Sequence, residues 1–389
     1  MAGGSTSSVE AIRSLLRGGF VVDAYERLLG ARGAGASSLE LVALEAETLE
    51  ALGMRADALR LLREKAAGAP LDVEILALLA DMEERNASSR TSQEGRQQGL
   101  EAALARYREG WRRQGGSGLG IRVATLEHAL GHRREACEAA RHVLGSIDHE
   151  LVARGLSVEA RRRALAARAE ACLVLARMDE AQEAYAALRR EALSQRAWPA
   201  LRTARARLRL IAEGALPESP VRVRRAEILD MLATPPVVVA VGHIVDAEGR
   251  SPPRFPDALI GAVREAIVEV LDRSGVSVGL SSLAAGADLL FQEELANRGV
   301  DRHVVLPHEP RTFVARSVEG RGHHPWAPAF RRQWDGADQH VLTARSARCD
   351  EGHAYQLVNE TLLGLARLEA DRLETDVVGL AVWDGRPGD

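Results

Sequence analysis

Proline is almost absent from residues 9–213 of this 389-residue chain, where only Pro70 and Pro199 occur. The same stretch is rich in alanine, leucine, arginine and glutamate, which favour helices, whereas proline disrupts them. Apolar residues recur there at helical spacing, for example over residues 39–52. These features predict that residues 1–216 form an α-helical region.

A short pattern recurs in this helical region, in which a small residue is followed five positions later by alanine. The copies are Gly19 with Ala24, Gly53 with Ala58, Gly131 with Ala136, and Ala176 with Ala181. The first two are 34 residues apart, the period of the tetratricopeptide repeat, a pair of antiparallel helices with small residues where they cross. Later spacings are longer, which predicts insertions in Asn86–Gly99 and Ile147–Ser157. The region resembles degenerate tetratricopeptide repeats with four to six helix pairs, and a non-repeating helical bundle is the alternative.

The pattern changes after a proline-marked stretch, residues 217–236, which we expect to be a linker. Short apolar runs then alternate with helical stretches. Strands are expected at Val237–Val241, Val276–Leu280, His303–Leu306, Gln339–Thr343 and Val377–Trp383. Helices are expected at Asp257–Arg273, Ala287–Arg298, Pro328–Gly336 and Tyr355–Leu373. This alternation predicts a domain over residues 237–389 with a Rossmann-like, doubly wound parallel sheet and helices on both faces.

Composition narrows the classes of function. The net charge of −4 gives no basic excess of the kind that dedicated nucleic-acid binders carry. No apolar run reaches the roughly 18 residues of a membrane span. The N-terminus lacks the features of a signal peptide, and the three cysteines are far apart, which together predict a cytoplasmic protein. Lys65 is the only lysine and lies outside any glycine-rich loop, which excludes a Walker A phosphate loop.

Ligands of open parallel sheets bind at the carboxyl ends of the strands. The candidates after the first and last predicted strands are Gly242, His243, Asp246, Asp384 and Gly385. The turn Ser281–Asp288 after the second strand is rich in small and hydroxyl side chains and leads directly into a helix. The free N–H groups and positive dipole end of such a helix suit a phosphate. A tight turn that needs small residues only for packing is the alternative.

The second half also resembles a known superfamily. The segment SSLAAGADLLFQEELANRG resembles the SGxAxGxDxxAHxxAL signature of the DNA-processing protein A family and of the wider SLOG superfamily, which includes the LOG enzymes. VAVGHIVD, VVLPHEPRTFVARSV and LAVWDGRPGD are similar to that superfamily's first strand, third strand and the strand that leads to its phosphate loop. The resemblance covers Val237–Asp389.

The resemblance implies a site for a nucleotide or nucleotide-derived ligand. By position, Gly242 and His243 would line the base or ribose, and Asp288 would cap a helix or bind a ribose hydroxyl. Phosphate would be held by Ser281, Ser282, Gly286 and Ala287. Apart from the resemblance, the loops that follow the strands add Asp246, Ala285, Asp384 and Gly385 as candidates, and Arg316, beside Ser317, is a candidate to hold phosphate through its planar guanidinium. No metal is predicted, because no paired CxxC accompanies His323, His324, Cys349 and His353.

Three functions are compatible with this sequence. The first is a nucleotide sensor whose helical repeats bind a protein partner or effector, in bacterial signalling or defence, with homo-oligomers as a further expectation. The second is a hydrolase of an N-glycosidic bond, as in LOG enzymes. Their catalytic PGGxGTxxE motif is missing here, so Glu293 or Asp246 would have to supply the acid. The third is a scaffold with a vestigial pocket.

The end of the sequence leads to one more expectation. The superfamily places a glycine- and threonine-rich turn and a helix after its last strand, and residues 386–389 contain neither. We therefore expect either that the natural protein continues beyond Asp389 or that a partner chain covers the last strand. Without that helix, one face of the last strand would leave Val378, Leu380 or Val382 exposed.

Overall fold

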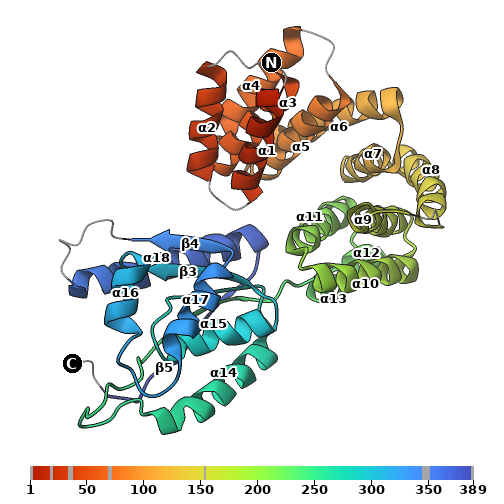
Figure 1. Ribbon diagram of the computed structural model, residues 1–389. Helices are drawn as coiled ribbons and strands as arrows, with labels where there is room; N and C mark the ends of the chain where they lie inside the picture. The colour runs from red at the N-terminus through yellow and green to blue at the C-terminus, as the bar shows by residue number, and fades with distance from the viewer. Residues whose placement is uncertain are drawn as a thin grey trace. The chain divides into compact units, whose positions relative to one another are not determined.

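The computed structural model describes residues 3–17, 21–33, 38–68, 72–152, 155–343 and 351–386. The chain divides into two compact units, Met1–Leu232 and Ala233–Asp389 (Figure 1). The first unit is helical, and the second contains a five-stranded sheet.

Consecutive helices of the first unit pack as pairs. The helices are α1 (Gly3–Arg17), α2 (Val21–Gly33), α3 (Leu39–Ala51), α4 (Arg55–Gly68), α5 (Val73–Ser88), α6 (Gln93–Gln114), α7 (Ser117–Ala129), α8 (Arg133–Val152), α9 (Val158–Val174), α10 (Met178–Gln195), α11 (Trp198–Gly214), α12 (Pro220–Val223) and α13 (Arg225–Met231). Each odd-numbered helix from α1 to α9 contacts the even-numbered helix that follows it. The described residues therefore contain five helix pairs, followed by α11 with the short α12 and α13.

The recurring small residue lies in the turn of a pair, and the alanine lies in the second helix. Gly53, Gly131 and Ala176 have φ angles of +79°, +85° and +58°. This left-handed conformation ends a helix and favours residues with little or no side chain. The alanines that follow, Ala58, Ala136 and Ala181, are fully buried. The pattern therefore marks a helix end and the contact after it; Gly19 lies outside the described residues.

The predicted insertions are part of longer helices. The pairs after the first begin at residues 39, 73, 117 and 158, and α11 begins at residue 198, so the spacing grows from 34 to between 40 and 44 residues. The segment Asn86–Gly99 forms the end of α5, a four-residue turn and the start of α6. Residues 147–152 extend α8. The repeats are longer here because their helices are longer.

The stretch 217–236, which we expected to be a linker, is largely helical and packs on the first unit. Helices α12 and α13 lie inside it and contact α11, and Ile228 and Leu232 are fully buried. Pro220 is the first residue of α12, a position where the missing N–H of proline costs nothing. The boundary between the units falls after Leu232, so most of this stretch belongs to the helical unit.

All strands of the second unit run parallel. They are β1 (Val237–Gly242), β2 (Val278–Ser281), β3 (Asp301–Leu306), β4 (Gln339–Leu342) and β5 (Val377–Val382), in the spatial order β4-β3-β2-β1-β5. The first four strands advance across the sheet in one direction. The chain then returns to the other side of β1, where β5 pairs with it over six residues. The strand order thus reverses between β1 and β5.

Helices pack on both faces of this sheet. The helices between the first four strands are α14 (Ile260–Ser274), α15 (Ala287–Asn297), α16 (Pro310–Ser317) and α17 (Trp326–Asp335), and α18 (Glu351–Leu373) leads to β5. A short 3₁₀ turn, η1 (Asp257–Leu259), precedes α14. Helix α15 contacts β1, β2 and β3 and packs between α14 and α17, whereas α18 returns across the other face (Figure 1). The eight-residue helix α16 was not predicted.

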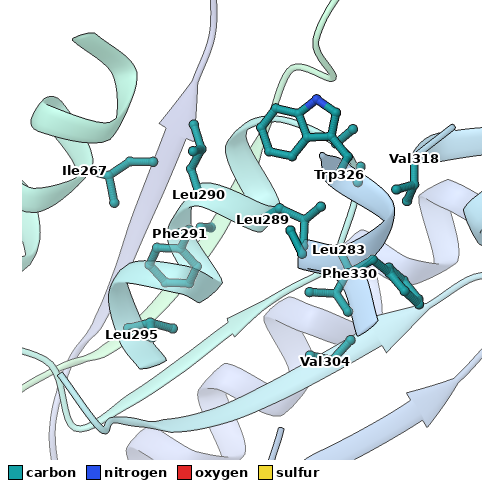
Figure 2. Packing of buried hydrophobic residues seen from close by; sticks show 14 of the residues in the cluster. Ile267, Leu283, Leu289, Leu290, Phe291, Leu295, Val304, Val318, Trp326 and Phe330 are labelled. Carbon is teal, nitrogen blue, oxygen red and sulfur yellow. The ribbon is translucent and has the colours of Figure 1, made fainter. Parts of the chain in front are cut away.

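The core of the second unit lies between the sheet and α14, α15 and α17. Figure 2 shows α15 supplying Leu289, Leu290, Phe291 and Leu295, which gather with Trp326 and Phe330 of α17, Ile267 of α14 and Val304 of β3. The last strand also packs here. Leu380 is buried, and Val378 and Val382 lie against the same cluster, so the exposed face that we expected on β5 is covered.

Candidate functional site

A cavity of about 190 Å³ borders the carboxyl ends of β1 and β2, and we call it the strand-end cavity. Helix α18 supplies one wall. The lining residues are Ala240, Val241, Gly242, Ile244, Ser282, Ala284, Asp288, Tyr355, Val358, Asn359 and Leu362. Three residues predicted from the sequence are among them, namely Gly242, Ser282 and Asp288. The four residues from α18 were not predicted.

Gly242 ends β1 where no side chain fits. A Cβ atom there would lie 2.5 Å from the Cβ of Ala287 and 2.8 Å from the Cβ of Val382. Because α15 and β5 approach the backbone this closely, glycine is the residue that allows β1, β5 and α15 to meet at the cavity.

Asp288 and Ser282 bring polar atoms to the cavity. Asp288 is the second residue of α15 and is only 7% exposed. Its Oδ2 accepts a hydrogen bond from the N–H of Ala284 at 3.3 Å. Burial raises the pKa of this carboxyl to about 7, and the bond from Ala284 opposes the rise. Among the described residues, the buried Oγ of Ser282 has no hydrogen-bond partner.

The rest of the turn Ser281–Asp288 uses its polar groups internally. Ser281 Oγ donates to the carbonyl of Ser282 at 2.7 Å and accepts from Gln292 at 3.0 Å. The N–H of Ala285 donates to the carbonyl of Ser317, and the N–H of Ala287 donates to the carbonyl of His243.

Gly286 packs directly on the backbone of the loop after β1. It has a φ of +123°, and a Cβ there would lie 2.8 Å from the carbonyl oxygen of His243. The small residues of this turn thus serve close packing, whereas Ser282 and Asp288 reach the cavity.

A second polar cluster lies where the strand order reverses. His243 follows β1 and Asp384 follows β5, and His243 Nε2 lies 3.2 Å from Asp384 Oδ1. Arg254 donates from Nε and Nη2 to the two carboxylate oxygens of Asp384, both at 3.0 Å. These bonds, above all those from Arg254, hold the pKa of Asp384 well below its usual range. The cluster ties the loop after β1 to the chain after β5, where Gly385 turns with a φ of +80°.

Two acids considered for hydrolysis lie elsewhere. Asp246 Oδ2 accepts from the N–H groups of Arg254 and Phe255, both at 2.9 Å, and the residue borders a separate hollow of about 460 Å³. Glu293 pairs with Arg264 at 2.5 Å. Neither side chain lines the strand-end cavity.

Arg316 and Ser317 lie at the end of α16. Ser317 is buried, and its Oγ lies 2.7 Å from the hydroxyl of Tyr355, which lines the cavity. Arg316 is exposed, and its Nη1 lies 3.3 Å from Nε2 of His308, whose ring packs edge-on against Tyr355. Tyr355 therefore links both predicted residues to the cavity wall.

The first unit contains a groove of about 730 Å³, which we call the helical groove. It is lined by α7, α9, the turn before α11 and α11 itself, and its apolar surface comes mainly from alanines. Its charged residues are Arg122, Glu159, Arg162, Arg163 and Glu170. No residue of this groove was singled out from the sequence.

Two charges at the base of the helical groove are buried. Glu170 accepts a hydrogen bond from Thr125 at 3.3 Å, and burial raises its pKa to about 7 against the opposing charge of Arg122. In the described part of the chain, Nη1 of Arg122 is buried without a hydrogen-bond partner. Arg122 also interacts with the charges of Glu84 and Asp81 outside the groove lining, and three arginines stand against two carboxylates among the lining residues.

An ion pair between distant helices lies deeper in the same unit. Arg207 of α11 contacts Glu84 of α5, and both side chains are less than 9% exposed. Arg207 also lies 3.5 Å from Asp81. Arg207 and Glu84 are 123 residues apart in the sequence, so the pair joins two distant helices.

The described residues show no cluster of three or more His, Cys, Asp or Glu side chains arranged to bind a metal ion. Cys349 lies outside those residues. His132 Nδ1 lies 2.8 Å from Glu127, and His128 is buried. Within the same residues, no helix has the length and apolar character needed to cross a membrane.

No family model matches the chain, and no curated protein matches it. Among solved structures, a thermophilic TPR protein of Thermus thermophilus is similar to 58% of this chain and 98% of its own, with 19% sequence identity and a TM-score of 0.36.

Proposed function

We propose that the second unit binds a nucleotide or a nucleotide-derived small molecule at the strand-end cavity. The observation that carries this proposal is the position of the cavity, at the carboxyl ends of neighbouring parallel strands, where open α/β sheets bind ligands. Ser282, Asp288 and Asn359 converge on it, and Val358 and Leu362 supply an apolar wall. The resemblance of Val237–Asp389 to the SLOG superfamily supports the same class of ligand.

The cavity encloses part of such a ligand. Its volume of about 190 Å³ is below the roughly 300–1,000 Å³ of pockets that enclose a drug-sized molecule. A base or a ribose fits this description, and the rest of a nucleotide would lie outside the enclosed space.

Replacing Asn359 by alanine tests this site. Asn359 is exposed on α18 and lines the cavity, so the change leaves the core intact. The loss of one ligand hydrogen bond, about 0.5–1.5 kcal/mol, should weaken binding by about 2- to 10-fold. Mass spectrometry of small molecules that copurify with the full chain identifies a ligand, and calorimetry measures its affinity.

Asn297→Ala is the matched control, because Asn297 is exposed at the opposite end of α15. The two alanine variants should differ in affinity and agree in thermal stability. Equal affinities for both variants and the parent would place the ligand elsewhere.

The first unit, in this proposal, binds a segment of a partner protein in the helical groove. Stacked helix pairs create extended surfaces that suit such segments. The groove carries Arg122, Arg162 and Arg163 against Glu159 and Glu170, and the Glu170 carboxyl is partly protonated near neutral pH. An acidic segment complements this charge, whereas the chain as a whole carries −4. Ligand binding in one unit and partner binding in the other would make the protein a sensor in bacterial signalling or defence.

Arg162→Glu should weaken the binding of acidic peptides about tenfold, which is about 1.4 kcal/mol. Fluorescence anisotropy with a library of acidic peptides and their lysine-substituted counterparts measures the effect, and added salt should reduce the affinity of the parent chain. Arg141→Glu on α8 is the control, because Arg141 is exposed and does not line the groove. A preference for the lysine-substituted peptides would refute the acidic partner.

A further inference from the structure

We propose that the group which enters the strand-end cavity is a nitrogen heterocycle that donates N–H hydrogen bonds to Asp288, and that phosphate stays outside. This inference rests on the proposed function, because it names the part of the ligand that the cavity takes. It also reverses the expectation that the turn Ser281–Asp288 holds phosphate.

The charge of the lining residues disfavours phosphate in the cavity. Among the described residues, those that line the cavity include no arginine, lysine or histidine, and their one carboxyl group is Asp288. A phosphate there would meet a like charge without a cation to offset the loss of its hydration. A neutral or cationic ring meets no such repulsion.

A carboxyl group already lies at the N-terminal end of α15. The N-terminus of α15 is the feature that would attract an anion. Asp288, the second residue of the helix, already places a carboxyl group there. The N–H of Ala287 is bonded to the carbonyl of His243, and Gly286 packs against the same backbone. The carboxyl group of Asp288 and the bond already made by the Ala287 N–H therefore make this helix end less favourable for an anion.

Asp288 and Ser282 have hydrogen-bonding capacity that the described residues leave unused. An ionised carboxyl can accept about four hydrogen bonds. For Asp288, the donor found among the described residues is the N–H of Ala284, at a long 3.3 Å. The Oγ of Ser282 is buried nearby without a partner in the described chain. The edge of a nucleobase presents N–H donors beside ring acceptors, so it can satisfy both groups at once.

The walls and the size agree with a ring. Val241 and Leu362 are apolar lining residues from β1 and α18. Flat heterocycles pack well on such side chains and keep their polar edge for hydrogen bonds. The cavity of about 190 Å³ encloses one such ring system and leaves the sugar and phosphate at its mouth.

The test uses the full chain and two kinds of probe. Adenosine, guanosine, cytidine and uridine carry a base without phosphate, whereas ribose 5-phosphate and inorganic phosphate carry phosphate without a base. Calorimetry at pH 7.5 should detect at least one nucleoside and neither phosphate probe. Asp288→Asn should weaken the nucleoside about tenfold or more. Ser282→Ala should weaken it by a smaller factor, and Asp335→Asn, at an exposed position of α17, should leave it unchanged.

The direction in which Asp288→Asn changes the affinity distinguishes a ligand whose base enters the cavity from one whose phosphate enters it. If ribose 5-phosphate binds and Asp288→Asn tightens it, phosphate enters the cavity and the inference is overturned, while the proposed function stands. If no nucleoside, nucleotide or phosphate probe binds the parent chain, the proposed function fails, and the inference fails with it.

Discussion

Arg207→Ala is expected to lower the free energy of unfolding of the first unit by about 3–5 kcal/mol. Arg207 contacts Glu84 and lies 3.5 Å from Asp81, and the side chains of Arg207 and Glu84 are 6% and 8% exposed. Removing the guanidinium leaves the carboxylate of Glu84 buried without its partner from α11. Urea denaturation followed by hydrogen exchange of α5 and α11 peptides measures the loss and assigns it to this unit.

Two further variants define what the pair contributes. Arg134→Ala removes an arginine whose side chain is 82% exposed, and its cost should stay below about 1 kcal/mol. The double variant Arg207→Met with Glu84→Leu removes both charges and should recover most of the loss. If Arg207→Ala costs no more than Arg134→Ala, the buried pair does not stabilise the unit.

Asp288→Asn is expected to stabilise the second unit at alkaline pH. Burial raises the pKa of Asp288 from 3.8 to about 7, so the folded state holds a proton that the unfolded state has released over that range. The free energy of unfolding therefore falls as the pH rises from about 4 to about 7. The loss corresponds to about 4 kcal/mol at most, at about 1.4 kcal/mol for each pH unit.

Asparagine cannot ionise, so the variant should exceed the parent in stability at pH 8 and match it near pH 4. Denaturation of parent and variant at several pH values, with hydrogen exchange of α15 peptides as the signal, tests this. Asp335→Asn is the control, because Asp335 is exposed and should show no pH-dependent gain. A constant difference between parent and Asp288→Asn from pH 4 to pH 8 would contradict a buried, titrating carboxyl. Asp288 destabilises its own unit at neutral pH, and a role in binding would explain why the protein keeps such a residue.

The strands of the second unit were predictable because each is a short apolar run between helical stretches. All five predicted strands are present, with ends that differ by one or two residues. Helix α16 was missed because PRTFVARS is only eight residues long and two of its residues are buried, too few for a periodic pattern. The turns of the helical unit carried a readable signal, but the small residue marked a left-handed helix end where we expected a helix crossing.

The site was less predictable than the fold. Strand order in a parallel sheet indicates where ligands bind, and this located Gly242, Ser282 and Asp288 at the cavity. Strand order does not indicate which side chains face the cavity. Ser281 and Gly286 were therefore predicted to contact the ligand, although they pack within the turn. Strand order also does not identify Asn359, which lies 77 residues after Ser282 in the sequence and lines the cavity from α18.

The order of strands also affects how the chain folds as it is synthesised. Helix pairs of the first unit form mostly between neighbours in sequence, so each pair can pack soon after it leaves the ribosome. In the second unit, β1 needs β5 as its neighbour, and Val237 pairs with Val377, which is synthesised 140 residues later. Until then, the apolar edge of β1 lacks its partner. The helical unit can therefore fold before the sheet of the second unit is complete.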